Sequence, residues 1–255
     1  MRAGRKIFLL ALMAALGGAC RPFAPRPETG PPRAKTPSYP PSLTFGASRR
    51  EQALAAWAQL VRSQGIERAP APELDPVTAT IRALPQLPTR LRLPHIGLQE
   101  MMSENELREA ARRFIAAHAT LLGAEPTVLS LVAVEDGPQG SRILRYRQAA
   151  FVYPLADGYG AVEITALPDG RLLNLASSAI PDAGRVARGI AELRPIVSAE
   201  QAVRRAGGTS ARRVVIFPLV QPPSTLNFHL AWEVVGPSAP AYIDARTGEP
   251  LAAPR

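Results

Sequence analysis

The stretch that decides the fold is SRILRYRQAAFVYPLADGYGAVEITALPDGRLLNLASSAI, residues 141–180. Apolar and polar residues alternate along it with the period of two that is typical of β-strands. The glycine-containing turns DGYG and PDG divide it into three strands. A further alternating segment, residues 127–135, precedes it across the turn DGPQG. The sequence therefore predicts an antiparallel meander of four strands.

A helix is predicted just before this meander. Residues 104–124, ENELREAARRFIAAHATLLGA, place apolar side chains at helical spacing along one broad face. Ser103 and Glu106 form a capping box at its start, and Gly123 ends it as a left-handed cap. A sheet that curls over the apolar face of this helix gives an α+β layer.

The same scheme is repeated further along the chain. VSAEQAVRRAGG, residues 197–208, predicts a helix with Ser198 as N-cap and Gln201 three residues later. Three strands are predicted after this helix, at residues 212–220, 227–235 and 240–245. Helix and meander thus occur twice, joined by a connection at residues 181–196.

Two segments that precede these units are less regular. A helix is predicted to open at Ser48, with Glu51 completing a capping box and Gly65 ending it. Residues 69–99 are rich in proline, which argues against any long strand.

Aspartates in this chain stand beside glycines or in turns, where turn chemistry explains them. The last turn shows the pattern, because Asp244 supplies a side-chain acceptor at its start and Gly248 tolerates positive φ at its end. The same interpretation applies to Asp136, Asp157 and Asp169.

The chain begins with the features of a secretory signal. MRAGRKIFLLALMAALGGAC has a positive start, an apolar stretch and small residues before Cys20, which is the only cysteine. The residues Gly17-Gly18-Ala19-Cys20 resemble a bacterial lipobox, although Gly17 stands where leucine is usual. We expect Cys20 to carry lipid and to bind the bilayer; cleavage by the ordinary signal peptidase, which would leave a free thiol, is the alternative. Because Arg21 follows, the resemblance to other lipoproteins implies the outer membrane in a cell with two membranes.

Charge and composition narrow the functional classes. The chain has 255 residues and a net charge of +9, which invites a nucleic-acid interpretation. Its basic residues are scattered arginines interleaved with acidic residues, and no basic run contains stacking aromatic residues. The sequence therefore predicts no nucleic-acid partner.

Two parts of the chain resemble modules of protease propeptides. Residues 103–182 are similar to the FTP module (fungalysin/thermolysin propeptide) in ARRFIAAHATLLG, in LRYRQAAFVYPLADGYGAVEI and in LPDGRLLNLASSAIP. Residues 197–252 resemble the PepSY module of thermolysin-like zinc proteases, which commonly ends in segments like AWEVVGPSAPAYIDARTGEPL. The resemblance implies two cystatin-like units, each a helix packed on a curved antiparallel sheet.

The expected domain organisation follows from these segments. It comprises a signal peptide at residues 1–19, a lipidated cysteine and disordered Pro-rich tether at 20–47, an N-terminal helix and Pro-rich irregular segment at 48–99, an FTP-like domain at 100–182 and a PepSY-like domain at 183–255.

The protease itself is missing from the pattern. A thermolysin-like enzyme needs His-Glu-x-x-His on a helix, but the residues that follow the three histidines are Ile96, Ala119 and Leu230. Neither a Gly-x-Ser-x-Gly elbow nor a phosphate-binding Gly-x-x-x-x-Gly-Lys loop is found. We therefore expect no catalytic residue, no metal and no cofactor, and predict that the chain is not an enzyme.

Two functions remain open. The first is a free-standing, lipid-anchored propeptide that inhibits or chaperones an exported zinc metalloprotease in trans, as the resemblance implies. The alternative is a cell-envelope binding or scaffold lipoprotein without a protease partner. Candidate partner contacts cluster along one strand and its turn, although alternation turns half of them toward the core: they are Arg145, Tyr146, Arg147, Phe151, Tyr153 and Tyr159.

Overall fold

A computed structural model describes residues 38–156 and 158–252. The predicted signal segment, Cys20 and residues 21–37 of the predicted tether lie outside these described residues, as does Asp157. These described residues form one compact unit. Within the part of the chain that the structure describes, no helix is long and apolar enough to cross a membrane.

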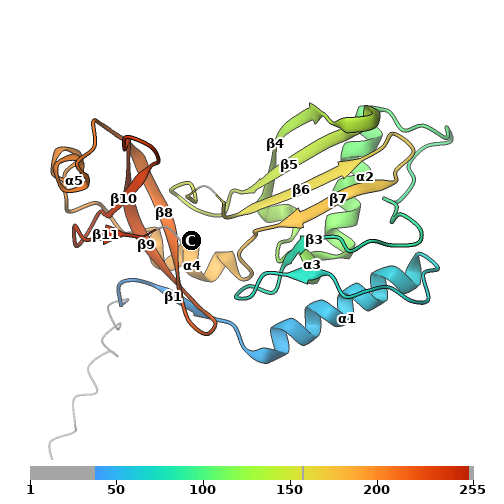
Figure 1. The fold of residues 1–255 in the computed structure, drawn as a ribbon, viewed down its shortest axis with the longest axis horizontal. Helices are drawn as coiled ribbons and strands as arrows, with labels where there is room; N and C mark the ends of the chain where they lie inside the picture. Colours follow the sequence, from blue (N-terminus) through green and yellow to red (C-terminus); the bar gives the residue numbers. More distant parts are fainter. Residues whose placement is uncertain (1–37, 157, 253–255) are drawn as a thin grey trace, which may run out of the picture. The chain divides into compact units, whose positions relative to one another are not determined.

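The predicted four-stranded meander is present. The strands follow one another in the order β4-β5-β6-β7, and every neighbouring pair is antiparallel (Figure 1). A short 3-10 turn at Pro126–Val128 leads into the sheet, and another at Pro138–Gly140 joins its first two strands. The strands are β4 (Leu129–Asp136), β5 (Arg142–Gln148), β6 (Ala161–Ala166) and β7 (Leu172–Ser177).

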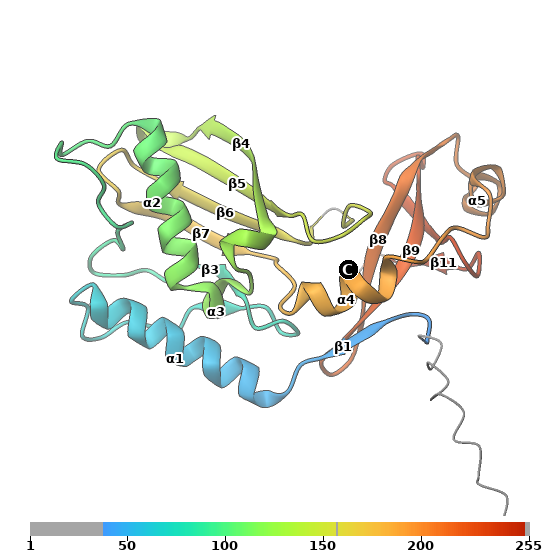
Figure 2. The same cartoon turned by 180° about the vertical axis from the view of Figure 1, so that it is seen from behind.

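Helix α2 (Glu104–Ala117) covers one face of this sheet (Figures 1 and 2). Its capping box is formed as predicted, because Ser103 accepts from the Glu106 N–H and the Glu106 carboxylate accepts from the Ser103 N–H. The helix breaks at His118, and one further turn, α3 (Ala119–Leu122), ends at Gly123 with φ 75°. The core between helix and sheet contains Leu107, Phe114, Ile115, Leu144, Ile164 and Leu175.

Helix α1 (Ala47–Ser63) belongs to the same core through Trp57, whose Nε1–H donates to the Pro70 carbonyl at 3.0 Å. The predicted capping box at Ser48 is wrong. Gly46 is the N-cap and Ala47 is already helical, so Ser48 lies two residues past the position from which a side chain caps the helix. The end at Gly65 is as predicted, with φ 73°.

The Pro-rich segment contains regular pieces. Strands β2 (Glu73–Leu74) and β3 (Ile81–Ala83) pair as a short hairpin. Further along, Arg92 pairs with Arg171 in an isolated antiparallel bridge, which lays residues 91–93 beside β7.

The second sheet has β9 at its centre. Strand β8 pairs with β9 along its whole length, so β1 and β10 share the opposite edge of β9, end to end. The strands are β1 (Ser42–Thr44), β8 (Ala211–Gln221), β9 (Thr225–Val234), β10 (Ala241–Asp244) and β11 (Pro250–Leu251).

Helix α5 (Ala199–Ala206) packs on this sheet through Ala202, which contacts a cluster with Val234 and Ile243. Its capping box between Ser198 and Gln201 is confirmed. The expected class is thereby confirmed as mixed α+β, with a helix packed on each antiparallel sheet.

Two differences from the sequence prediction concern the connections. Helix α4 (Ala183–Ile190) forms inside the segment predicted as a plain connection, with Val186 and Ile190 buried. Strand β1 lies inside the segment predicted as a disordered tether, and residues 42–44 are instead paired with β9. The physical reason is Leu43, which is only 3% exposed and packs in an apolar cluster.

Candidate functional site

The predicted contact residues on β5 divide between two faces of the sheet. Arg145 and Arg147 are exposed, whereas Tyr146 between them is buried against the α2 core. Arg145 forms ion pairs with Glu135 on β4 at 2.7 Å and with Glu163 on β6 at 3.1 Å. Its charge is therefore balanced within the sheet itself.

The predicted aromatic contacts pack against the second sheet of the same chain. Phe151, Tyr153 and Tyr159 are partly buried on one apolar cluster, and the Tyr153 hydroxyl donates to the Leu193 carbonyl at 3.3 Å. The structure thus brings these three residues together and places Arg145 and Tyr146 elsewhere. The cluster they join contains Leu43, Ile180, Val186, Ile190, Ile216, Leu226 and Phe228.

The backbone of the same segment pairs with β8, which is why the predicted strand over residues 141–156 ends early, at Gln148. Ala156 N–H donates to the Ile216 carbonyl and Ile216 N–H donates to the Pro154 carbonyl, both at 2.8 Å. Gln148 lies where the chain leaves the first sheet. Its side-chain amide accepts from the Ile180 N–H at 2.9 Å and donates to the Ile180 carbonyl at 3.0 Å.

The two edges of the first sheet differ. Residues 91–93 cover β7, since Leu93 N–H donates to Gly170 and Leu172 N–H donates to Leu91. Within the described residues, β4 pairs only with β5. The bond from Ala149 N–H to Val128 makes Leu129 and Gln148 a non-hydrogen-bonded pair, so the peptide groups of Leu129 face away from β5. By the alternation of antiparallel pairs, Leu131 opposite Tyr146 is also a non-hydrogen-bonded pair, and a register shift follows it at Leu131–Ala133. The Leu129 N–H donates instead to the Pro126 carbonyl of the preceding turn, which leaves its carbonyl unpaired by β5.

A hollow of about 410 Å³ lies beside this free edge, between β4 and α2. Its apolar lining includes Leu129, Leu131 and Ile115, together with the ring of Tyr146. Arg108 and Arg112 also line it, and each forms an ion pair with a glutamate of its own helix. Of the six predicted contacts, Tyr146 alone lines this hollow.

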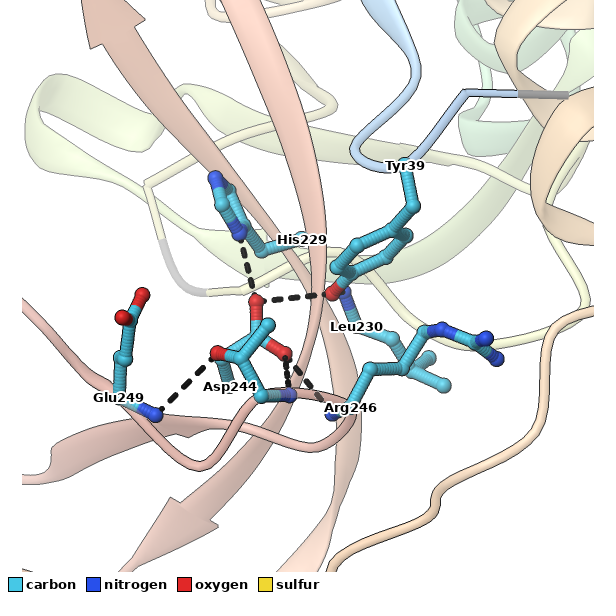
Figure 3. Close-up of polar contacts among 7 residues, drawn as sticks. Tyr39, His229, Leu230, Asp244, Arg246 and Glu249 are labelled. Carbon is cyan, nitrogen blue, oxygen red and sulfur yellow. Dashed lines mark hydrogen bonds and ion pairs between the residues drawn. The ribbon is translucent and has the colours of Figure 1, made fainter.

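Figure 3 shows a polar cluster that the sequence prediction missed. Asp244 Oδ2 accepts from the Tyr39 hydroxyl at 2.8 Å and from His229 Nδ1 at 2.7 Å. Its Oδ1 accepts from the backbone N–H groups of Arg246 and Thr247, at 2.8 and 2.9 Å. The turn interpretation of Asp244 is thereby confirmed for one carboxylate oxygen, while the other joins β9 to the segment before β1.

The electrostatics of the cluster favour an ionised Asp244. Burial alone would raise the pKa of this carboxyl, but hydrogen bonds from His229, Thr247, Arg246 and Tyr39 outweigh it and hold the pKa below its usual value. Burial, followed by the adjacent Asp244 carboxylate, raises the pKa of the Tyr39 hydroxyl. Because a carboxylate only accepts, His229 Nδ1 carries the proton of their bond.

The chemistry open to this cluster is limited by its full hydrogen bonding. All four bonds of Asp244 are made within the chain, and the Tyr39 hydroxyl also accepts from Leu230 N–H at 3.1 Å. A histidine oriented by an aspartate provides two of the three members of a catalytic triad, but no serine, threonine or cysteine of the described residues bonds to His229. We interpret the cluster as structural, because it links β9 and β10 of the second sheet to the segment before β1.

The sequence identified one residue of this cluster, because the turn pattern marks Asp244. Nothing local marks Tyr39, which lies 205 residues earlier in the chain. In residues 38–156 and 158–252, no three histidine, cysteine, aspartate or glutamate side chains gather in a way that could hold a metal ion.

Comparison with known proteins gives little beyond this geometry. No protein-family model matches the chain, and no curated protein matches it. Among solved structures, the Bacillus megaterium YpeB C-terminal domain is similar at 12% identity and a TM-score of 0.30, covering 82% of this chain and 96% of that chain. An uncharacterized protein from Eubacterium rectale is similar at 12% identity and a TM-score of 0.24, covering 63% of this chain and 58% of that one. TM-scores this low assign the chain to no family.

Proposed function

We propose that this chain is a non-catalytic binding module that holds an extended segment of another polypeptide along β4. The observation that carries the proposal is the free edge of β4, where the Leu129 carbonyl and the peptide groups of Leu131 face away from β5. The Leu129 N–H already donates to the Pro126 carbonyl. An added strand would bond to these groups, as in β-strand addition generally.

The hollow beside the edge fits the same occupant. Side chains of an added strand alternate between the two faces of the sheet. Those on the α2 side would meet the apolar lining formed by Ile115, Leu129, Leu131 and Tyr146. On the opposite face they would meet a charged row formed by the exposed Glu135 and Arg145 and the half-buried Glu163. We therefore expect a segment with apolar residues at every second position.

The resemblance to FTP and PepSY propeptides supports a more specific partner, an exported zinc metalloprotease on a separate chain. The module would inhibit that enzyme or assist its folding in trans. The lipobox-like residues before Cys20 support attachment of the module to a membrane.

The test uses the full chain, purified in mild detergent, and the chelator-sensitive protease activity secreted by the host. Stoichiometric inhibition is expected. Leu131→Glu places a charge in the hollow and should weaken inhibition at least tenfold. Ser130→Glu is the matched control, because Ser130 is the exposed neighbour whose side chain points to the other face. Thermal unfolding of both variants verifies that the fold is intact.

Two outcomes would contradict the proposal. If the wild-type chain neither inhibits nor retains a protease, the metalloprotease is not the partner, and the scaffold alternative takes its place. If Leu131→Glu inhibits as well as Ser130→Glu, the partner does not bind along β4.

A further inference from the structure

Three arginines line one hollow at the edge of the first sheet that residues 91–93 cover. The hollow has a volume of about 750 Å³ and is bounded by Arg90, Arg92 and Arg171, with Pro88 and Leu167 among its apolar walls. Neither the β4 edge nor the Tyr39 cluster contributes to it. It is a separate candidate site.

Two of the arginines oppose each other directly. Arg92 pairs with Arg171, and the flanking bonds run from Leu93 N–H to Gly170 at 2.9 Å and from Leu172 N–H to Leu91 at 2.7 Å. This pattern makes them a non-hydrogen-bonded pair, the arrangement that brings opposed side chains closest, with Cα atoms typically about 4.5 Å apart. Like charges in this position are destabilising. The fold alone gives no reason to keep two guanidinium groups there.

The charge of the group is only partly balanced. The Asp169 carboxylate accepts hydrogen bonds from the backbone N–H of Arg171 at 3.1 Å and from the Arg171 Nε at 2.6 Å. The side chains of Arg90 and Arg92 have no hydrogen bond or ion pair to any described residue. Three guanidinium groups therefore face one carboxylate, an excess of two positive charges.

The backbone that carries the central arginine is held in place. The Gln64 side chain, just after α1, accepts from Arg92 N–H at 3.3 Å and donates to its carbonyl at 3.2 Å. These bonds fix the position of Arg92 while leaving its guanidinium group free to bind a ligand.

We propose that this hollow, which we call the arginine hollow, binds a phosphate ester. Guanidinium groups bind phosphate oxygens through paired, charge-assisted hydrogen bonds, and a doubly charged anion matches the excess of two positive charges. The volume lies within the range of small-molecule sites, about 300–1,000 Å³, so there is room for the organic group that carries the phosphate. A soluble phosphate monoester and the phosphomonoester headgroup of phosphatidic acid share this chemistry.

The test compares two double variants of the full chain that lose the same charge. Arg92→Gln with Arg171→Gln removes the opposed pair. Arg50→Gln with Arg188→Gln is the control, because both of these arginines are exposed and lie outside the hollow. Glycerol 3-phosphate is titrated calorimetrically at low ionic strength. Vesicles of phosphatidylcholine, with and without phosphatidic acid, are tested by flotation.

The wild-type chain and the control should bind glycerol 3-phosphate, or prefer the anionic vesicles, with affinities within twofold of each other. The Arg92/Arg171 variant should bind at least tenfold more weakly. A preference for glycerol 3-phosphate identifies a soluble ligand, and a preference for anionic vesicles identifies a headgroup; either supports the proposal. A lipid attached to Cys20 would bind both types of vesicle. The difference in flotation between the two types therefore reports binding in the hollow alone.

The proposal is overturned if the wild-type chain binds neither probe, if both double variants lose binding equally, or if succinate binds as tightly as glycerol 3-phosphate. A separate readout guards against a folding defect. Because removing Arg92 and Arg171 relieves like-charge repulsion, that variant should unfold at the same or a higher temperature than the wild-type chain at low salt.

Discussion

Asp244 makes four hydrogen bonds at once, and its carboxylate must be charged to accept all of them. In Asp244→Asn the remaining oxygen can still accept from the turn, but the new amide nitrogen cannot accept from Tyr39 or His229. We expect a loss of about 3 kcal/mol in the free energy of unfolding at pH 7, because a buried pair loses one partner. Urea unfolding measures it; a loss below about 1 kcal/mol would mean that Tyr39 and His229 are held by other contacts.

The same carboxylate predicts a pH dependence. The pKa of Asp244 is lowered in the folded chain, since the hydrogen bonds it accepts outweigh its burial. Its contribution to stability is therefore complete above the ordinary carboxyl pKa, about 4, and is lost as the pH falls through the lower folded value. Below about pH 4 the wild-type chain should lose stability more steeply than Asp244→Asn. Parallel stability curves for the two proteins would contradict this assignment.

At the scale of elements, two serines were candidates for helix N-caps, and only one of them caps its helix. Ser103 accepts from Glu106 N–H at the start of α2, whereas Ser48 lies inside α1 and caps nothing. Ser103→Ala should therefore cost about 1 kcal/mol of unfolding free energy, and Ser48→Ala less than about 0.5 kcal/mol. Chemical denaturation of the two variants checks this. Equal losses would mean that the capping box contributes nothing to stability.

The elements that could be predicted from the sequence are those with enough local pattern. Helix α2 has fourteen residues and a capping box, and the meander strands have alternation and glycine turns. Strand β1 has three residues, too few to show a period, and exists because Leu43 is buried against β9. Helix α4 contains Gly184 and Gly189, whose poor helix propensity conceals it.

Strand β5 shows a different limit. Its alternation continues through residues 149–156, but the backbone there leaves the first sheet and pairs with β8. Local pattern identifies an extended segment without saying which strand it will pair with. The choice between β4 and β8 is made by contacts distant in the sequence.

At the scale of the whole chain, the same limit explains the candidate site. Phe151, Tyr153 and Tyr159 were predicted to face a partner, and the structure packs them against the second sheet of their own chain. An aromatic residue that packs on another sheet of its own chain shows the same sequence pattern as one that contacts a partner protein. The Tyr39–Asp244 bond and the Arg92–Arg171 pair also unite distant residues, so neither leaves a local signal.

The cluster around Phe228 predicts how the two cores unfold. Phe228 on β9 is fully buried in the cluster that receives Phe151 and Tyr153. The two tryptophans report separately, because Trp57 lies in the α2 core and Trp232 packs against the α5 cluster. With Trp57→Phe or Trp232→Phe as background, each chain keeps one reporter. While Phe228 is present, the cluster couples the cores, and both reporters should show the same urea midpoint.

Phe228→Ala should separate those midpoints. The truncation costs about 3–5 kcal/mol, and the loss falls on the second sheet and on its contact with Phe151, Tyr153 and Tyr159. The Trp232 midpoint should fall by about 1 M urea or more, while the Trp57 midpoint moves less. Val234→Ala is the control, because Val234 is equally buried but packs on α5, where no residue of the first sheet contributes. It should lower both midpoints together, since the coupling cluster stays intact. Midpoints that stay coincident in Phe228→Ala would show that the cores are coupled elsewhere, with Gln148 and its two bonds to Ile180 as the next contact to remove.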